Sequence, residues 1–250
     1  MLFATMGVLL LLLLEPTASL PFFATHPPSA PSAQQQLILI SGCTGTGKST
    51  FGMEVAISRG ILKCISTDTI RQVQRTYDTR SALHRSSFQG TDEPAINWRE
   101  TCDILQDSID NVVYDCLGRG ISLVLEGVHI VPDRKLVDAW MSKGGIAVGC
   151  VLYIPDEEIH RAVISRRGEQ TTKGAAQQLE RFTRIRAIHD EMLRLGQLND
   201  WLLIEQKPTM DLRPIDLVNR ELTKDSSRRI TWVEGKGQNL LSWNPAVWKG

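Results

Sequence analysis

The chain has 250 residues, with 28 Lys plus Arg against 28 Asp plus Glu and a hydrophobic share of 42%. This length and composition suit one well-buried domain and exclude a chain that is disordered throughout. The zero net charge argues against a dedicated nucleic-acid binder. The five cysteines form no CxxC pair, which excludes a disulfide framework and the common zinc spacings, so we expect reduced, mostly buried thiols.

The first 36 residues differ in composition from the rest. An apolar run from Val8 to Leu14 precedes small residues at 17–19, as in a signal peptide, and Pro21 to Gln36 has the composition of a disordered linker. The run is too short to span a bilayer, so we expect no stable membrane span. We expect this leader to direct the protein to a plastid, because that location would agree with reduced thiols and ATP use. The cytoplasm is the alternative location. An untargeted leader or a wrongly assigned start codon is the other interpretation.

From residue 37 on, strands alternate with helices, which predicts a three-layer α/β domain at 37–225 around a mostly parallel, five-stranded sheet. Apolar runs predict strands at 37–40, 63–66, 121–125, 146–154 and 201–204. Periodicity and composition predict helices at 49–59, 69–77, 104–117, 131–141, 156–167 and 175–195. Residues 81–98 are expected to form a loop or short-helix insertion, and 226–250 a tail.

The strongest motif lies between the first strand and the first helix. The pattern GxxxxGK[ST] is fitted by Gly42, Cys43, Thr44, Gly45, Thr46, Gly47, Lys48 and Ser49. Its glycines allow backbone N–H groups to turn inward around nucleotide phosphates, and the helix N-terminus adds a favourable dipole. We expect Lys48 to act on the transferred phosphate, Ser49 to bind Mg²⁺ and Thr50 to complete the nucleotide site.

A phosphate loop alone does not separate kinases from GTPases or mechanical ATPases. The sequence contains no Asn-Lys-x-Asp motif for reading guanine, and it is too short for the extra modules of large ATPases. We therefore expect a small-molecule kinase that uses ATP and Mg²⁺.

An acidic residue and a basic residue follow the second predicted strand, at the edge where open α/β sheets bind ligands. Asp68 is expected to orient the attacking hydroxyl or to act as its general base, which makes it a catalytic candidate. A helix N-cap is the alternative role for Asp68. Arg71, one helical turn later, is expected to bind an anionic group of the same substrate.

The third predicted strand ends in a carboxylate. Glu126 is expected to order Mg²⁺ together with Ser49 and to border the substrate. His129 follows at the sheet edge, where it would either meet the substrate or form a hydrogen bond within its own loop.

Positive charge is concentrated between residues 161 and 186, which suits phosphoryl transfer to an anionic acceptor. Arg161 and Arg166 are expected to contact the nucleotide. The segment 168–174 separates two predicted helices, so we expect it to hinge them as a lid that excludes water.

The arginines of the next predicted helix are expected to point in different directions, because they differ in helical phase. Arg184 borders the inward face, and Arg186 is about 140° away, so we expect Arg186 to face solvent. Arg181 is a catalytic candidate and Arg184 a substrate-binding one, with a solvated position as the alternative for Arg184. Arg181 shares the inward face with Ile185, Ile188 and Met192.

The assembled motifs resemble those of the 2-phosphoglycerate kinases known from archaea, between about Leu37 and Ile204. This resemblance implies a nucleoside-kinase-like P-loop fold with an arginine-rich lid. It also implies transfer of the ATP γ-phosphate to the 3-hydroxyl of 2-phosphoglycerate, giving 2,3-bisphosphoglycerate and ADP. The insertion would add hydrogen bonds from His84, Ser86 and Ser87. The residues that carry the resemblance are the phosphate loop, 66–71, 83–88, 125–132 and 184–188, of which 126–132 is the most specific.

Two other functions remain open. One is a kinase for another anionic or sugar-like acceptor. The other is a nucleotide-binding regulatory module of low turnover that binds a partner through its tail, although the tail could instead pack on the domain. The regulatory module is suggested by basic and aromatic residues of the tail, namely Arg228, Arg229, Trp232, Lys236, Trp243 and Trp248. We expect a small anionic substrate and no nucleic-acid partner, while the sequence does not indicate an oligomeric state.

Overall fold

The computed structural model describes residues 34–86, 93–170, 175–207 and 214–224. Ser87, residues 171–174, the leader up to residue 33 and the tail at 226–250 lie outside these ranges, so what the sequence predicts for them stays a prediction. Within the described ranges, no helix combines the length and the hydropathy that crossing a membrane requires.

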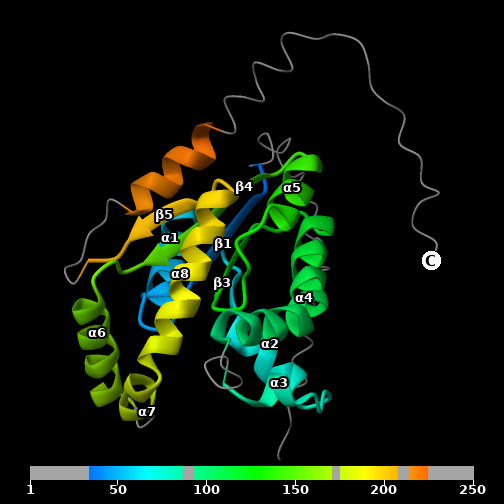
Figure 1. Cartoon of the computed structure of the whole chain (residues 1–250). Helices are drawn as coiled ribbons and strands as arrows, with labels where there is room; N and C mark the ends of the chain where they lie inside the picture. Colours follow the sequence, from blue (N-terminus) through cyan, green and yellow to red (C-terminus); the bar gives the residue numbers. More distant parts are fainter. Residues whose placement is uncertain (1–33, 87–92, 171–174, 208–213, 225–250) are drawn as a thin grey trace, which may run out of the picture. The chain divides into compact units, whose positions relative to one another are not determined.

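Five strands form one sheet, and Figure 1 shows helices on both of its sides. Their order in the sheet is β2-β3-β1-β4-β5, and every pairing is parallel. The predicted α/β fold with a five-stranded, mostly parallel sheet is therefore confirmed. The strands are β1 (Gln36–Gly42), β2 (Cys64–Ser66), β3 (Leu123–Gly127), β4 (Ile146–Tyr153) and β5 (Leu202–Glu205).

The helices form the outer two layers. α1 and a helix at 214–224 pack on one face of the sheet, while α4, α5 and α8 pack on the other. The labelled helices are α1 (Lys48–Arg59), α2 (Thr67–Gln74), α3 (Ser81–His84), α4 (Pro94–Gly118), α5 (Lys135–Ser142), α6 (Glu157–Gln170), α7 (Ala175–Glu180) and α8 (Phe182–Leu198).

The central strand β1 contributes to both cores, because successive side chains of a strand point to opposite faces. Leu37 and Leu39 pack with α4, α5 and α8, whereas Ile38 and Ile40 pack with α1. All four side chains are at most 1% exposed. Burial of each of these side chains contributes about 1.5–3 kcal/mol to the free energy of folding. The position of β1, and of the start of the loop that follows it, is therefore well fixed.

Two boundaries differ from the predicted ones. Gln36 already belongs to β1, and the Gln35 carbonyl oxygen accepts hydrogen bonds from the Ile146 N–H at 2.8 Å and the Trp140 indole at 3.2 Å. The predicted disordered linker therefore ends earlier than expected. α4 begins at Pro94, ten residues before its predicted start. Proline suits the first position of a helix, because the backbone N–H that it lacks would have no partner within the helix there.

The long helix predicted at 175–195 is two helices. α7 ends at Glu180 and α8 begins at Phe182, because the Arg181 backbone has φ −100° and ψ 13°, outside the helical region. The break takes Arg181 out of the helix that carries Ile185, Ile188 and Met192, with which it was predicted to share a face. Gly168, which was predicted to belong to the hinge, lies within α6.

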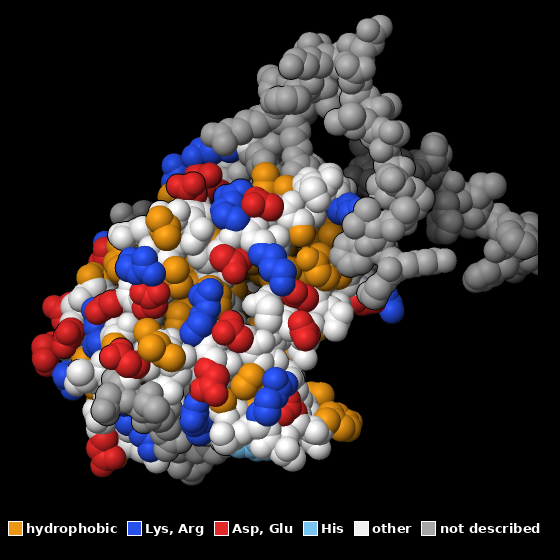
Figure 2. Space-filling view, turned by 45° about the vertical axis from the view of Figure 1, so that its right-hand side comes forward, with side chains coloured by type: hydrophobic (Ala, Val, Ile, Leu, Met, Phe, Trp, Pro, Cys, Tyr) orange, Lys and Arg blue, Asp and Glu red, His pale blue; other side chains and the backbone are white. Residues whose placement is uncertain are grey.

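Acidic and basic side chains are mixed over the face shown in Figure 2, where the described residues of the two signs lie next to one another. Several of these charges pair across one helical turn, a geometry worth at most about 1 kcal/mol per exposed pair. Opposite charges are therefore neighbours on these helix surfaces. Examples with their distances are Arg99 with Asp103 (3.7 Å), Arg119 with Asp115 (2.8 Å) and Arg134 with Asp138 (2.7 Å).

Candidate active site

The phosphate loop lies between β1 and α1, at the carboxyl end of the sheet. Gly45 and Gly47 have φ of +84° and +76°, in the left-handed region that glycine adopts without steric cost. A Cβ at Gly45 would lie 2.9 Å from Ile164 Cγ1, so this position also lacks space for a side chain. Thr46 Oγ1 donates to the Cys43 carbonyl oxygen at 2.9 Å and closes the turn. The predicted motif thus has the backbone of a phosphate-binding nest.

Three other residues of the predicted nucleotide site differ in their exposure. Cys43 is fully buried, its Sγ donates to the Ile185 carbonyl oxygen at 3.4 Å, and burial raises the pKa of its thiol to about 12. Gly42 is also buried, and a Cβ there would lie 2.7 Å from the Leu152 carbonyl oxygen. Thr50 is exposed in the first turn of α1. Gly42 and Cys43 therefore shape the loop through packing.

The two predicted magnesium-binding residues are in direct contact. Ser49 Oγ donates to Glu126 Oε1 at 3.1 Å, and Glu126 is only 5% exposed. The neighbouring Lys48 places Nζ 2.8 Å from the Cys43 carbonyl oxygen. Mg²⁺ prefers oxygen ligands and keeps waters and phosphate oxygens around it, so a hydroxyl beside a carboxylate fits such an ion next to the phosphate loop.

Asp68 lies at the same edge of the sheet and is open to solvent. Its carboxylate is 74% exposed, and Oδ1 lies 3.6 Å from His129 Nδ1. Ser66 caps α2, because its side chain accepts the Asp68 backbone N–H at 3.3 Å. The alternative in which Asp68 is itself the N-cap is therefore wrong. Strand register places Ser66 opposite Glu126, so both acids lie at the ends of neighbouring strands.

His129 lies beneath this edge, with an exposed fraction of 1%. Arg71 has only donor groups, so His129 Nε2, 3.5 Å from Arg71 Nη1, accepts and Nδ1 carries the proton. Nδ1 then donates to Thr67 Oγ1 at 3.2 Å. Burial, followed by the charges of Arg71 and Lys48, lowers the pKa of His129 well below its ordinary value. The imidazole is therefore neutral. It bonds to two residues of α2, whereas the alternative predicted a hydrogen bond within its own loop, and it supports the start of α2.

Arg71 was expected to bind the acceptor, and the structure buries its guanidinium. The residue is 8% exposed, and burial lowers its pKa to about 10. Its Nε donates to the Leu83 carbonyl oxygen at 3.0 Å, and Nη2 donates to the Arg85 carbonyl oxygen. Arg71 thus fixes the insertion around α3 to α2. In that insertion His84 is exposed with Nε2 2.6 Å from the Asp78 carbonyl oxygen, and Ser86 is half-buried.

The arginines predicted for the nucleotide and the acceptor lie on α6 and at the start of α8. Arg161 stacks on Phe182, with its guanidinium carbon 3.8 Å from the ring centroid. Arg166 lines a cavity beside the phosphate loop. Arg181 and Arg184 are half-buried. Of these four residues, Arg166 shares a cavity with the phosphate loop, and the roles of the other three stay predictions.

Arg186 contradicts the prediction that it faces solvent. Its side chain is 12% exposed, Nη1 donates to the Ile154 carbonyl oxygen at 2.7 Å, and Nη2 lies 3.1 Å from Asp190 Oδ1. Arg186 lies one turn from Phe182 and one turn from His189, both of which are buried. The prediction considered only the stripe of Ile185 and its partners and overlooked this second buried row.

The cavity beside the phosphate loop has a volume of about 460 Å³. Gln206 lines it from the end of β5, and its Oε1 would lie 3.5 Å from a Cβ at Gly47. Mostly apolar walls with a few polar groups suit the aromatic base of a nucleotide whose phosphates occupy the loop. The apolar walls come from Ile154, Ile159, Ala162 and Val163.

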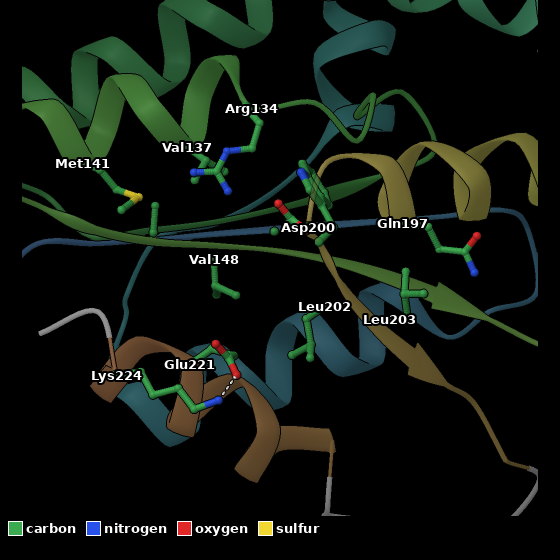
Figure 3. A pocket seen from close by; sticks show the side chains of 13 residues that line it. Arg134, Val137, Met141, Val148, Gln197, Asp200, Leu202, Leu203, Glu221 and Lys224 are labelled. Carbon is green, nitrogen blue, oxygen red and sulfur yellow. Dashed lines mark hydrogen bonds and ion pairs between the residues drawn. The ribbon is translucent and has the colours of Figure 1, made fainter. Parts of the chain in front are cut away.

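A larger cavity of about 690 Å³ lies elsewhere, between α5, the first residues of β4 and β5, and the helix at 214–224 (Figure 3). Three of its charged groups are in ion pairs, because Glu221 pairs with Lys224 at 2.6 Å and Arg134 pairs with Asp138 at 2.7 Å. It is at the ends of β4 and β5 opposite to the phosphate loop. Its size therefore does not make it the site of phosphate chemistry.

Sequence reasoning did not assign Gln206 or His160 to the surroundings of the loop, and it placed Arg186 in solvent. Gln206 follows the last strand at the carboxyl edge of the sheet, and that position was a usable signal. His160 is a lone histidine in a charged helix, and no pattern in the sequence marks it as buried. Its ring is nevertheless 0% exposed and touches the phosphate loop.

No family model matches the chain. It is 31% identical over 204 residues to the 2-phosphoglycerate kinase of Methanothermobacter thermautotrophicus, covering 75% of this chain and 65% of the relative. It is 27% identical over 212 residues to the 2-phosphoglycerate kinase of Methanocaldococcus jannaschii, covering 80% and 66%. The chain thus spans just under two thirds of the length of these curated relatives.

Among solved structures, a protein from Chloroflexus aurantiacus J-10-fl matches with a TM-score of 0.50 and 14% identity, over 76% of this chain and 99% of that one. Identity this low shows a shared fold alone. The resemblance predicted from the motifs is confirmed by the sequence relatives: over about three quarters of its length, the chain is similar to archaeal 2-phosphoglycerate kinases.

Proposed function

We propose that the protein is an ATP-dependent kinase that phosphorylates the 3-hydroxyl of 2-phosphoglycerate, giving 2,3-bisphosphoglycerate and ADP. The relatives named 2-phosphoglycerate kinase support this acceptor. The observation that carries the kinase activity is the meeting of a phosphate loop, the Ser49 and Glu126 pair and the exposed Asp68 at one edge of the sheet.

The nucleotide would bind with its phosphates in the loop and its base in the adjoining cavity. Gly45 and Gly47 let the backbone present N–H groups to the phosphates, and Lys48 adds a positive charge. Arg166 and Gln206 border the base cavity and supply its polar groups. ATP is the proposed nucleotide because the sequence lacks the guanine-reading motif.

Ser49 and Glu126 would hold Mg²⁺ beside these phosphates. The hydroxyl and the buried carboxylate are adjacent, as the oxygen ligands of such an ion must be. The ion would neutralise negative charge that develops during phosphoryl transfer.

The transfer itself would depend on Asp68. Its exposed carboxylate accepts the proton of the acceptor hydroxyl while the hydroxyl oxygen bonds to the γ-phosphorus. The bond from the γ-phosphorus to the bridging oxygen breaks, and ADP leaves with that oxygen. Neutral His129 keeps Asp68 and the start of α2 in place from below.

An acceptor that carries a carboxylate and a phosphate needs cations close to its hydroxyl. Half-buried Arg181 and Arg184 are proposed to supply them, because Arg71 already donates to two backbone carbonyls. Arg71 then contributes indirectly, through the shape of the insertion around α3.

The test measures ADP release by the purified chain with Mg²⁺-ATP and a panel of acceptors. 2-Phosphoglycerate is expected to stimulate release well above the rate without acceptor, and 3-phosphoglycerate, gluconate, shikimate and an inositol phosphate are expected to stimulate it far less. Stimulation by a different acceptor would replace 2-phosphoglycerate and keep the kinase. Tight ADP binding without stimulation by any acceptor would favour the regulatory module instead.

A further inference from the structure

A buried histidine holds the phosphate loop from behind. His160, on α6, places Nε2 2.8 Å from the Thr44 carbonyl oxygen, and its ring would lie 3.3 Å from a Cβ at Gly45. The residue is 0% exposed. None of the roles derived above for the nucleotide or the acceptor uses this side chain.

The surroundings of His160 fix its tautomer. Arg186 Nη1 lies 3.5 Å from His160 Nδ1, and a guanidinium can only donate, so Nδ1 is the acceptor. The proton of the neutral ring is therefore on Nε2, which donates to the Thr44 carbonyl oxygen. Burial lowers the pKa of His160, in keeping with a neutral ring at pH 7.

This hydrogen bond determines which way one peptide unit of the loop faces. The peptide between Thr44 and Gly45 is trans and planar, so its carbonyl oxygen and its N–H point in opposite directions. A carbonyl drawn toward His160 turns the Gly45 N–H away from α6. That N–H has no hydrogen-bond partner among the described residues, which leaves it available to a ligand oxygen.

His160 is itself held in place from the end of β4. Arg186 donates to the Ile154 carbonyl oxygen, and the Ile154 N–H donates to His189 Nε2 at 3.1 Å. His189 Nδ1 then donates to Asp190 Oδ1 at 2.8 Å, and Arg186 Nη2 donates to the same oxygen at 3.1 Å. Through His160 and Arg186, this network of hydrogen bonds ties α6 and α8 to the loop.

We infer that His160 is a positioning residue for nucleotide binding: it fixes the Thr44–Gly45 peptide so that the Gly45 N–H faces the β-phosphate. Preorganised N–H donors avoid the cost of turning the peptide when the ligand arrives. The inference rests on nucleotide binding by the phosphate loop and not on the acceptor. A binding assay without any acceptor therefore separates its failure from failure of the proposed acceptor.

The test compares the affinities for ADP and AMP of two His160 variants at constant Mg²⁺. In His160→Leu the ring donor is lost, and the affinity for ADP is expected to fall about tenfold, the effect of one charge-assisted hydrogen bond. AMP lacks the β-phosphate, so its affinity is expected to change less than about twofold. His160→Gln keeps an amide donor at similar reach and is expected to recover most of the affinity for ADP. Ile188→Val, at a fully buried position of α8, is the control for lost packing.

Unchanged affinity of His160→Leu for ADP would overturn the inference, and so would an equal loss for ADP and AMP. A second measurement needs only the unaltered protein, in case the leucine variant does not fold. NMR of ¹⁵N-labelled histidine is expected to show His160 protonated at Nε2 and unprotonated at Nδ1. The opposite tautomer would place the proton toward Arg186 and would also overturn the inference.

Discussion

The two acidic residues of the candidate site, Asp68 and Glu126, differ in their exposure to solvent. Glu126 is 5% exposed and accepts a hydrogen bond from Ser49, whereas the Asp68 carboxylate is 74% exposed beside a neutral imidazole. A buried carboxylate fixed by a hydroxyl suits a cation, and an exposed one suits an incoming acceptor. The difference in burial therefore supports the proposed division of roles between the two acids.

The role of Asp68 can be tested with Asp68→Asn. Asparagine keeps the size of the side chain but cannot take a proton from the acceptor, so kcat is expected to fall about 100-fold or more. The affinity for ADP is expected to stay within twofold, because Asp68 is not part of the phosphate loop. Steady-state kinetics and a nucleotide-binding titration measure the two effects separately.

Asp138→Asn is the matched control for Asp68→Asn, since Asp138 pairs with Arg134 on α5 and is remote from the loop. It is expected to leave both kcat and ADP affinity within twofold of the unaltered protein. Turnover of Asp68→Asn at the unaltered rate would remove Asp68 from the catalytic role.

At the scale of elements, the end of β3 and the start of α2 touch through one close contact. A Cβ at Gly127 would lie 1.7 Å from Thr67 Oγ1 and 2.8 Å from Thr67 Cβ, so only glycine fits. Thr67 is fully buried and bonds to His129. The position of α2, and with it that of Asp68, thus depends on a glycine at the end of a neighbouring strand.

Gly127→Ala is therefore expected to lower the free energy of unfolding by about 2 kcal/mol, a typical cost of overpacking. Thr67→Ala in the same chain removes the nearest contact and is expected to recover part of that loss. Urea unfolding of the single and double variants measures both values. Gly118→Ala, where nothing lies within 4 Å, is the control and is expected to change stability by less than about 0.5 kcal/mol. Equal losses in Gly127→Ala and Gly118→Ala would contradict this account.

Local patterns predicted much of the fold and the site, because they depend on neighbouring residues. The apolar run of β1, the phosphate loop and the acids after β2 and β3 all follow from composition and position along the chain. The burial of Arg186 was missed because the helical phase was measured from the row of Ile185 alone, whereas Phe182, Arg186 and His189 form a second buried row on the same helix. The contact of His160 with the loop joins residues 116 positions apart, which no local pattern reveals.

At the scale of the whole molecule, three histidines are buried in the supports of the site. His129, His160 and His189 are at most 2% exposed, and burial lowers the pKa of each of them. The groups that face these rings include Arg71, Lys48 and Arg186, which oppose protonation, and Asp190, which favours it. The fold thus holds neutral imidazoles at positions that an unfolded chain would protonate in mild acid.

This difference makes the stability of the protein depend on pH. The unfolded chain takes up protons on its histidines as the pH falls through about 6.5, and the folded chain does so only at lower pH. The contribution of the neutral histidines to the free energy of unfolding is therefore fully present above pH 6.5. It decreases below that pH, by up to about 1.4 kcal/mol per pH unit for each histidine. Urea unfolding at pH 7.5, 6.5 and 5.5 measures this slope, which is proportional to the number of protons taken up on unfolding. His160→Gln is expected to lower that number by about one. A stability that is constant between pH 7.5 and 5.5 would contradict the burial of neutral histidines.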